Sequence, residues 1–164
     1  MMICDKFVVE LNEVEQRLAR YIATRRQSIN SSAGINDLKF TARDSGGMHL
    51  DGFGGELAFC RLFNVYPDLQ VNDKNRADCR LHCGLTVDVK TTHHENGRLI
   101  SIRHKVEKQA DLYALVVGRF PRYRLVGLAT AEELFSDESL KDLGHGPTYM
   151  LDQDRLSLSP WLVT

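Results

Sequence analysis

The chain has 164 residues, of which 43% are hydrophobic and 26% charged, and its formal net charge is −1 at pH 7. A chain of this length can bury a core without disulfides, so residues 1–164 are expected to form a single domain. The near-neutral charge excludes a histone-like protein that coats polyanions. We expect no signal peptide or membrane span, and we expect the four cysteines to be reduced thiols. Together these features predict a cytoplasmic protein without a membrane partner.

The first predicted helix covers residues 10–28, because apolar residues recur there at helical spacing. Its predicted buried side consists of Leu11, Val14, Leu18, Tyr21 and Ile22. Residues 30–47 are rich in Ser, Gly and Asn and predict a loop. The loop is long for a compact domain, which is typical of segments that contact a substrate or move.

A second helix is predicted at about residues 53–63. Its apolar stripe consists of Phe53, Leu57, Cys60 and Phe63, and Glu56 lies at the edge of this stripe. Glu56 is either a functional carboxylate or a solvated acid favoured by the helix dipole near the start of a helix.

Strands are predicted to follow a turn at residues 66–68. Residues 77–81 and 85–92 alternate in polarity, and Gly84 marks the turn between them. Asn96-Gly97 is a strong hairpin signal, so residues 99–102 are expected to pair with residues 85–92.

The remaining predicted elements are a short helix at 104–110, a strand at 112–117 buried on both faces, and a strand at 123–128. A helix begins at residue 131 and opens a C-terminal extension, 131–164, which is weakly patterned from Gly144 on. The order of elements predicts a mixed α/β fold with its core at about residues 50–130.

Basic residues predominate from residue 98 to residue 124, whereas acidic residues predominate after residue 130. Such a basic region favours a local surface that binds a polyanion. The residues expected to bind a nucleic acid there are Arg98, Arg103, Lys105 and Lys108.

The segment from Leu85 to Thr92 places an acid and a base inside a β-branched run. Because successive side chains of a strand point to opposite faces, Asp88 and Lys90 lie on the same face. A carboxylate and an ammonium group are costly to bury unless they are paired or bound to a metal. A salt bridge at the surface of a sheet is the simpler alternative.

Three acids and one lysine are expected to converge: Glu56 from the helix, Asp78 from one strand, and Asp88 and Lys90 from its neighbour. Magnesium prefers hard oxygen ligands and takes one or two carboxylates with water and phosphate. Asp78, Asp88 and the carbonyl group of Val89 would supply such a site. Lys90 could position or deprotonate the attacking water, or neutralise charge on a phosphate. The chemistry predicted is phosphodiester hydrolysis.

A resemblance to a known family is carried by Gly55-Glu56-x-Ala58, Asp78, Asp88-Val89-Lys90 and Gln109-Ala110-Asp111. This order resembles the PD-(D/E)xK nuclease superfamily over about residues 53–128, although Ala77 replaces the proline that names the motif. The resemblance implies a restriction-endonuclease-like mixed β-sheet flanked by helices, with an αβββαβ core, to which an N-terminal helix is added here. It implies a magnesium-dependent site that cleaves DNA, with manganese as a substitute metal.

Carried over residue by residue, the resemblance makes Asp78, Asp88, Val89 and Glu56 the metal site and Lys90 the catalytic lysine. Gln109 corresponds to a catalytic position on the helix that follows the third strand. Cleavage of both DNA strands would require two active sites and hence a homodimer.

Two alternatives remain open. One is a DNA-binding module of nuclease-like fold that performs no chemistry, because phosphate contacts give affinity without catalysis. The other is a zinc-stabilised binding protein that uses the cysteines and histidines between residues 79 and 94. That cluster comprises Cys79, His82, Cys83, His93 and His94.

Overall fold

The structure is a computed structural model that describes residues 5–32, 45–71, 76–102 and 110–158. The helices are α1 (Glu13–Ser32), α2 (Ser45–Phe63) and α3 (Ala131–Leu134). The strands are β1 (Val8–Glu10), β2 (Cys79–Arg80), β3 (Thr86–Thr92), β4 (Leu99–Ile102), β5 (Leu112–Arg119), β6 (Arg122–Thr130), β7 (Leu140–Asp142) and β8 (Pro147–Leu151). Short 3-10 turns lie at Asp5–Phe7, Asp137–Ser139 and Gln153–Arg155.

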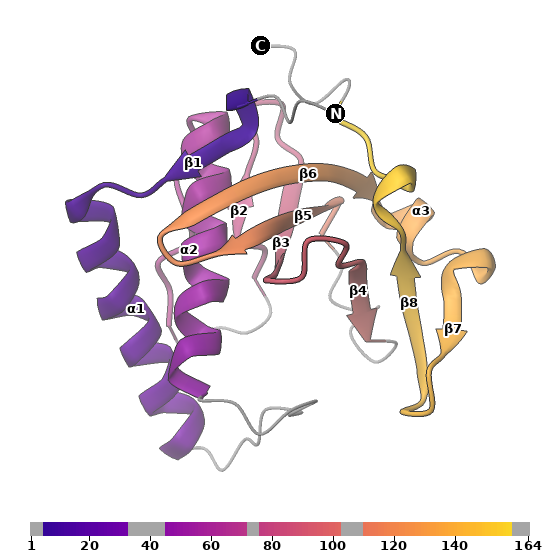
Figure 1. Ribbon diagram of the computed structural model, residues 1–164, viewed down its shortest axis with the longest axis horizontal. Helices are drawn as coiled ribbons and strands as arrows, with labels where there is room; N and C mark the ends of the chain where they lie inside the picture. The colour runs from indigo at the N-terminus through magenta and orange to yellow at the C-terminus, as the bar shows by residue number, and fades with distance from the viewer. Residues whose placement is uncertain (1–4, 33–44, 72–75, 103–109, 159–164) are drawn as a thin grey trace.

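The strands of the described part form two sheets. The larger sheet is mixed and curled, with the order β1-β6-β5-β3-β2, and the smaller has the order β4-β8-β7. β3 and β5 are parallel, whereas the other neighbouring pairs are antiparallel. α1 and α2 lie together beside the larger sheet, and β4, β7 and β8 lie at the other side (Figure 1). The protein is therefore mixed α/β, as predicted.

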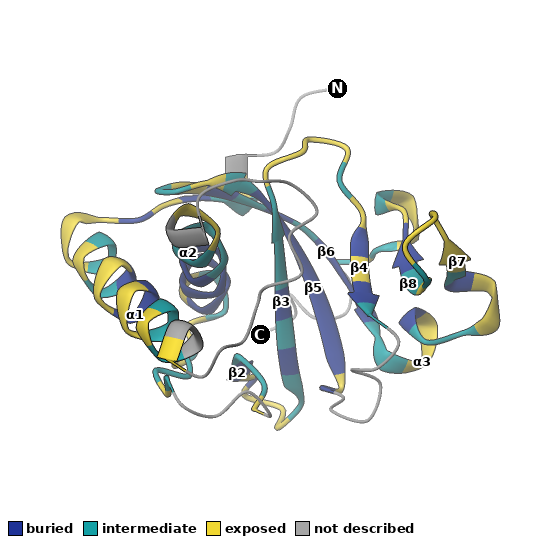
Figure 2. Ribbon diagram, turned by 90° about the horizontal axis from the view of Figure 1, so that it is seen from below, coloured by how far each residue is buried: buried dark blue, intermediate teal, exposed yellow. Residues whose placement is uncertain are grey.

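The hydrophobic core lies on both faces of the larger sheet. Val87, Val89 and Ala114 belong to a cluster that includes α2, whereas Tyr113 and Leu115 pack with residues of β4, β8 and α3. Residues 112–117 are all buried, which confirms the strand predicted to be buried on both faces (Figure 2). The strand predicted at 123–128 is confirmed as β6, and the helix at residue 131 as α3.

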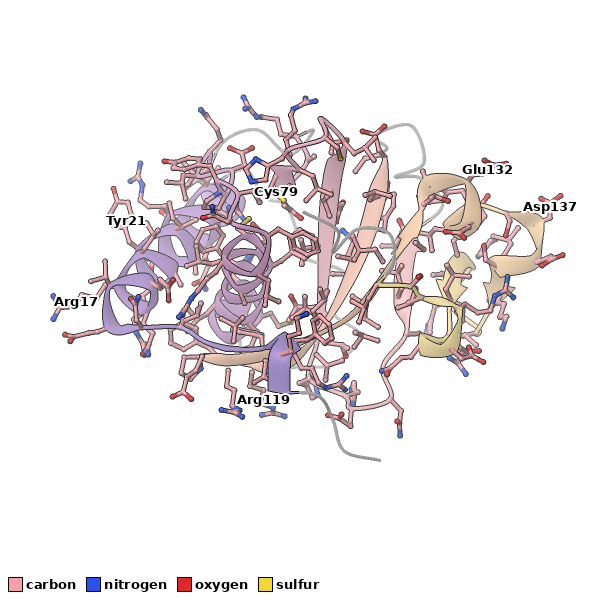
Figure 3. The ribbon with its side chains drawn as sticks, turned by 90° about the horizontal axis from the view of Figure 1, so that it is seen from above. Arg17, Tyr21, Cys79, Arg119, Glu132 and Asp137 are labelled. Carbon is pink, nitrogen blue, oxygen red and sulfur yellow. The ribbon has the colours of Figure 1, made fainter. Side chains whose placement is uncertain are left out.

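The helix α1 was predicted, but the prediction of which residues form its buried side was partly wrong. Val14 and Tyr21 are 75% and 64% exposed, and Figure 3 places Tyr21 on the side of α1 away from α2. Ile22 is buried as predicted, and Ala19 and Ala23 take the places expected for Val14 and Tyr21. These three positions follow the spacing of one helix face, and small alanine side chains let α1 lie close to α2.

α1 continues to Ser32, and α2 begins at Ser45 and not near residue 53, so the loop predicted at 30–47 is wrong at both ends. Its other residues from 33 to 44 lie outside the described part. The helix persists through several glycines because it packs closely on the sheet. A Cβ atom on Gly54 would lie 2.1 Å from the hydroxyl oxygen of Tyr123, and one on Gly55 would lie 2.1 Å from Oγ1 of Thr91.

The hairpin predicted between β3 and β4 is wrong. The turn forms, since the N–H group of Gly97 donates to the carbonyl oxygen of His94 over 2.9 Å, but β4 pairs with β8. The side chain of Gln153 donates to the carbonyl oxygens of Glu95 and Gly97 and so attaches the turn to the C-terminal residues. The extension that we predicted to be weakly patterned thus supplies two strands of the second sheet. The helix predicted at 104–110 falls almost wholly outside the described residues.

Within the described ranges, no helix is long and apolar enough to cross a membrane.

Candidate active site

Glu56 lies in the middle of α2 and is buried, so the interpretation of Glu56 as a solvated acid at a helix start is wrong. Atom Nη1 of Arg26 donates to both carboxylate oxygens of Glu56 over 3.1 Å. The Arg26 guanidinium also lies 4.8 Å from the centre of the Phe53 ring, and its Nη2 atom donates to the carbonyl oxygen of Asp68 over 3.2 Å. Glu56 is therefore a buried carboxylate with a fixed cationic partner.

Asp78 lies directly before β2, where the pairing of β2 with β3 ends. Its N–H group donates to the carbonyl oxygen of Val87 over 2.9 Å, and its carboxylate accepts the N–H group of Val89 over 2.6 Å. Cys79 is also paired with Val87, so two residues of this segment stand opposite one residue of β3 and the regular register ends here. The Asp78 carboxylate thus lies at Val89, the residue between Asp88 and Lys90.

Asp88 and Lys90 form an ion pair along β3, and both side chains are partly buried. Val87 and Val89 belong to the core with α2, so strand alternation directs Asp88 and Lys90 away from that helix. Glu56 thus approaches β3 from one face and the ion pair from the other. The charges of Glu56, Asp88 and Lys90 interact near the edge of β3, where its pairing with the two residues of β2 has ended.

Burial raises the pKa of Glu56 to about 7; Arg26 opposes this rise, and Asp88 adds to it. Burial also raises the pKa of Asp78 well above its ordinary value, and the charges of Glu56 and Asp88 raise it further. Burial alone would lower the pKa of Lys90, but the Asp88 carboxylate, with Asp78 and Glu56, outweighs burial and raises it. Three carboxylates therefore lie close to two cations, Lys90 and Arg26. Additional positive charge in this region would stabilise the ionised carboxylates.

The described residues contain no ready-made group of three His, Cys, Asp or Glu side chains that could hold a metal ion. Glu56 contacts Arg26, whereas the carboxylate of Asp78 is held at Val89 and that of Asp88 by Lys90, next to each other along β3. Since magnesium usually takes only one or two carboxylates, with water and phosphate, this pair matches its ordinary requirement. The donor atoms present fit a two-carboxylate site better than a closed protein cage.

Several residues of the predicted site are not placed. Gln109, Arg103, Lys105 and Lys108 lie outside the described residues, as does the second Asp-x-Lys triplet at residues 37–39. Asp111, which follows Gln109 closely, accepts hydrogen bonds from the N–H and hydroxyl groups of Thr86, both over 2.8 Å, so this end of the segment lies at β3. Arg98 forms an ion pair with Asp152 over 2.6 Å, which neutralises the charge expected to meet a nucleic acid.

The proposed zinc cluster is not assembled in the described part. Cys79 is buried and points between α2 and the sheet (Figure 3), where its thiol meets that of Cys60. His82 contacts the carbonyl oxygen of Asn64 over 3.1 Å, and Cys83 is exposed. The rings of His93 and His94 lie 4.0 Å apart at the far end of β3. The alternation of side chains along a strand explains why this cluster does not assemble, because it directs Cys79 away from its sequence neighbours.

Arg26 was not predicted as a site residue, although it lies within the helix predicted at residues 10–28. The helix continues to Ser32, and Arg26 follows Ala19, Ile22 and Ala23 on the same face. This spacing was visible in the sequence, but the large apolar residues Val14 and Tyr21 indicated another face.

The fold and the site define a mixed α/β protein with a cluster of acids and one lysine near the β2 edge of the larger sheet. The model of a family described as "Family of unknown function (DUF5843)" matches residues 3–158, and the chain belongs to that family. None of the curated proteins compared with the chain matches it.

Proposed function

We propose that this protein is a magnesium-dependent deoxyribonuclease of the PD-(D/E)xK type, with a restriction-endonuclease-like fold. The observation that carries the proposal is that the Asp78 carboxylate accepts the N–H group of Val89, the residue between Asp88 and Lys90, and lies close enough to Glu56 and Asp88 for their charges to raise its pKa. The order α2, β2, β3, followed by β5 parallel to β3, also supports the proposed fold.

Asp78 and Asp88 are the proposed metal ligands, with the carbonyl group of Val89 beside them. The N–H group of Val89 donates to Asp78. Because the N–H and C=O groups of one strand residue leave on the same side, this carbonyl group also points toward Asp78. Glu56 adds a third carboxylate, whose charge increases the affinity of the group for a cation. Bound magnesium would supply Lewis-acid activation of water and neutralise phosphate charge.

Lys90 is proposed to stabilise negative charge on the phosphate during in-line attack by water. Its raised pKa keeps it protonated at neutral pH, so the ammonium form supports an electrostatic role better than that of a general base. Asp88 contacts Lys90 and orients its ammonium group. Gln109 is proposed to assist at the same site.

The contact between Asp88 and Lys90 also favours the second candidate function, a nucleic-acid-binding module without catalysis. In that case the pair is only structural, and Asp78 only caps the N–H group of Val89. The two candidates predict different outcomes in one experiment.

The test is incubation with linear, nicked, branched and single-stranded DNA, with magnesium and with a chelator. The nuclease predicts cleavage that requires magnesium and is lost in Lys90→Ala. Lys141→Ala, a change at an exposed lysine of β7, is the matched control and should cleave normally. Binding of these DNAs without any magnesium-dependent cleavage would support the module and contradict the nuclease. The oligomeric state of the active protein, measured in parallel, tests the expected homodimer.

A further inference from the structure

A groove of about 770 Å³ runs along the outer edge of the larger sheet beside Asp78. One wall is formed by residues 66–71, which follow α2, and the other by Arg76, Ala77, Cys79, Arg80 and Thr86. The two walls are connected: the N–H group of Asp68 donates to the carbonyl oxygen of Asp78 over 2.7 Å, and Pro67 forms a β-bridge with Cys79. The groove is therefore contiguous with the candidate active site.

The lining of this groove combines an aromatic ring, apolar side chains and two guanidinium groups. Tyr66 is 77% exposed, which is unusual for a large aromatic side chain, and Leu69 and Val71 provide an apolar surface nearby. Arg76 is held by the Asp68 carboxylate over 3.0 Å, and Arg80 donates to the carbonyl oxygen of Gly84 over 2.6 Å. A guanidinium has five N–H donors, so these contacts fix each group and leave donors for an anion.

We propose that this groove binds unpaired nucleotides of the substrate, with one base stacked on Tyr66 and phosphates on Arg76 and Arg80. Aromatic side chains and arginines along a groove are the features that bind single-stranded nucleic acid. The volume lies within the range of pockets that hold small ligands, and so is sufficient for a nucleotide. A base inside a duplex is stacked on its neighbours and presents no free face to Tyr66.

This inference rests on the proposed function for its ligand, because it assumes a nucleic-acid substrate. It adds that the substrate has a single-stranded segment next to the position of cleavage. The connection to the site is direct: Asp68, which fixes Arg76, also accepts a hydrogen bond from Arg26, the partner of Glu56.

The test is the affinity of the full chain for a fluorescent oligothymidylate and for a hairpin duplex, measured by anisotropy with a chelator present so that no cleavage occurs. Tyr66→Ala should weaken oligothymidylate binding about tenfold, the loss expected when a stacked base loses its platform. Tyr66→Phe should restore the affinity. Tyr21→Ala removes a tyrosine of similar exposure from α1 and is the matched control, which should bind as wild type does.

Arg80→Gln should reduce the dependence of oligothymidylate affinity on salt by somewhat less than one unit of slope, as expected for one lost contact with a single strand. Duplex affinity should be unaffected by Tyr66→Ala. Oligothymidylate affinity within about twofold of wild type in Tyr66→Ala, or an equal loss for the duplex, overturns the inference, because a stacked base contributes more than that.

The outcomes separate the groove from the nuclease. If oligothymidylate binding depends on Tyr66 but no DNA is cleaved with magnesium, the groove is supported and the nuclease is not. If DNA is cleaved and Tyr66→Ala binds oligothymidylate normally, the nuclease is supported and the groove is not. Circular dichroism checks that each variant folds. We expect the Tyr66 variants to fold because Tyr66 is exposed.

Discussion

The guanidinium group of Arg26 holds the carboxylate of Glu56, with Nη1 3.1 Å from each carboxylate oxygen. This contact joins α1 to α2 and fixes a buried acid beside β3. Its consequences can be measured without any knowledge of the substrate.

Arg26→Ala should destabilise the protein, because it leaves the Glu56 carboxylate buried without a partner. The expected loss in free energy of unfolding is about 2 kcal/mol near pH 8, somewhat less than for a fully buried pair. Near pH 5, about two units below the pKa of Glu56, the carboxyl group is protonated and the loss should be smaller. Denaturant unfolding at both pH values measures this. Arg25→Ala, at the exposed neighbouring position, is the control and should change stability little.

Glu56→Gln should make stability less dependent on pH. The pKa of Glu56 is about 7 in the folded protein, above its ordinary value of 4.5, so the folded state binds this proton more tightly than the unfolded state. The stability that the proton contributes is fully present below about pH 4.5 and is lost as pH rises to about 7, by at most about 3 kcal/mol. Over this range the wild type should lose stability relative to Glu56→Gln. Parallel pH profiles of the two proteins, with a chelator present, would contradict the raised pKa.

Gly55→Ala should destabilise the protein by about 1–3 kcal/mol, the usual cost of overpacking. The added Cβ atom would lie 2.1 Å from Oγ1 and 3.2 Å from both Cβ and Cγ2 of Thr91, so rotation of Thr91 does not make room for it. Gly52→Ala is the matched control in the same helix, with no atom within 4 Å of its added Cβ. It should stabilise α2 by up to about 1 kcal/mol through helix propensity. Thermal unfolding of the two variants should therefore shift in opposite directions.

Lys90→Ala should lose at least about a hundredfold in single-turnover cleavage, because a charge that stabilises the transition state is removed. DNA binding should fall only modestly, since one phosphate contact among several is lost. Cleavage within about threefold of wild type, far short of the usual effect of such a group, would remove Lys90 from the mechanism.

Asp88→Asn should weaken the binding of manganese strongly, because one of two proposed carboxylate ligands is lost. Calorimetric titration of both proteins with manganese measures this, and equal affinities would exclude Asp88 as a ligand. Glu132→Gln, at an exposed acid of α3, is the control and should leave the affinity unchanged. Stoichiometric zinc in the purified protein would instead favour the cysteine and histidine cluster.

The sequence predicted those elements whose patterns are determined by local burial. Residues 112–117 form a continuous apolar run because β5 is covered on both faces, so this strand was identified correctly. The shared face of Asp88 and Lys90 followed from alternation. The start of α2 was missed because its glycines have low helix propensity, and only contact with Tyr123 and Thr91 explains their use in a helix.

The partner of β4 could not be predicted, because the choice depends on residues far along the chain. Asn96-Gly97 specifies a turn, but a turn does not specify which strand pairs with the strand that follows it. Gln153 and the strand β8 decide this from a segment whose own pattern is weak. Arg26 was missed for a related reason: a charged residue on a buried helix face makes sense only once Glu56 is seen opposite it.

The shortness of β2 also bears on how this protein avoids aggregation. In the described part of the chain, β2 pairs with β3 only at Cys79 and Arg80, and an unpaired strand edge is a template for a strand from a second molecule. Asp78 occupies the N–H group of Val89, and the charges of Asp88 and Lys90 stand next to it. The side chains proposed for chemistry therefore also keep the sheet from being extended by another chain. A variant such as Asp78→Val would remove the first of these protections, so its solubility has to be measured before any loss of activity is assigned to the reaction.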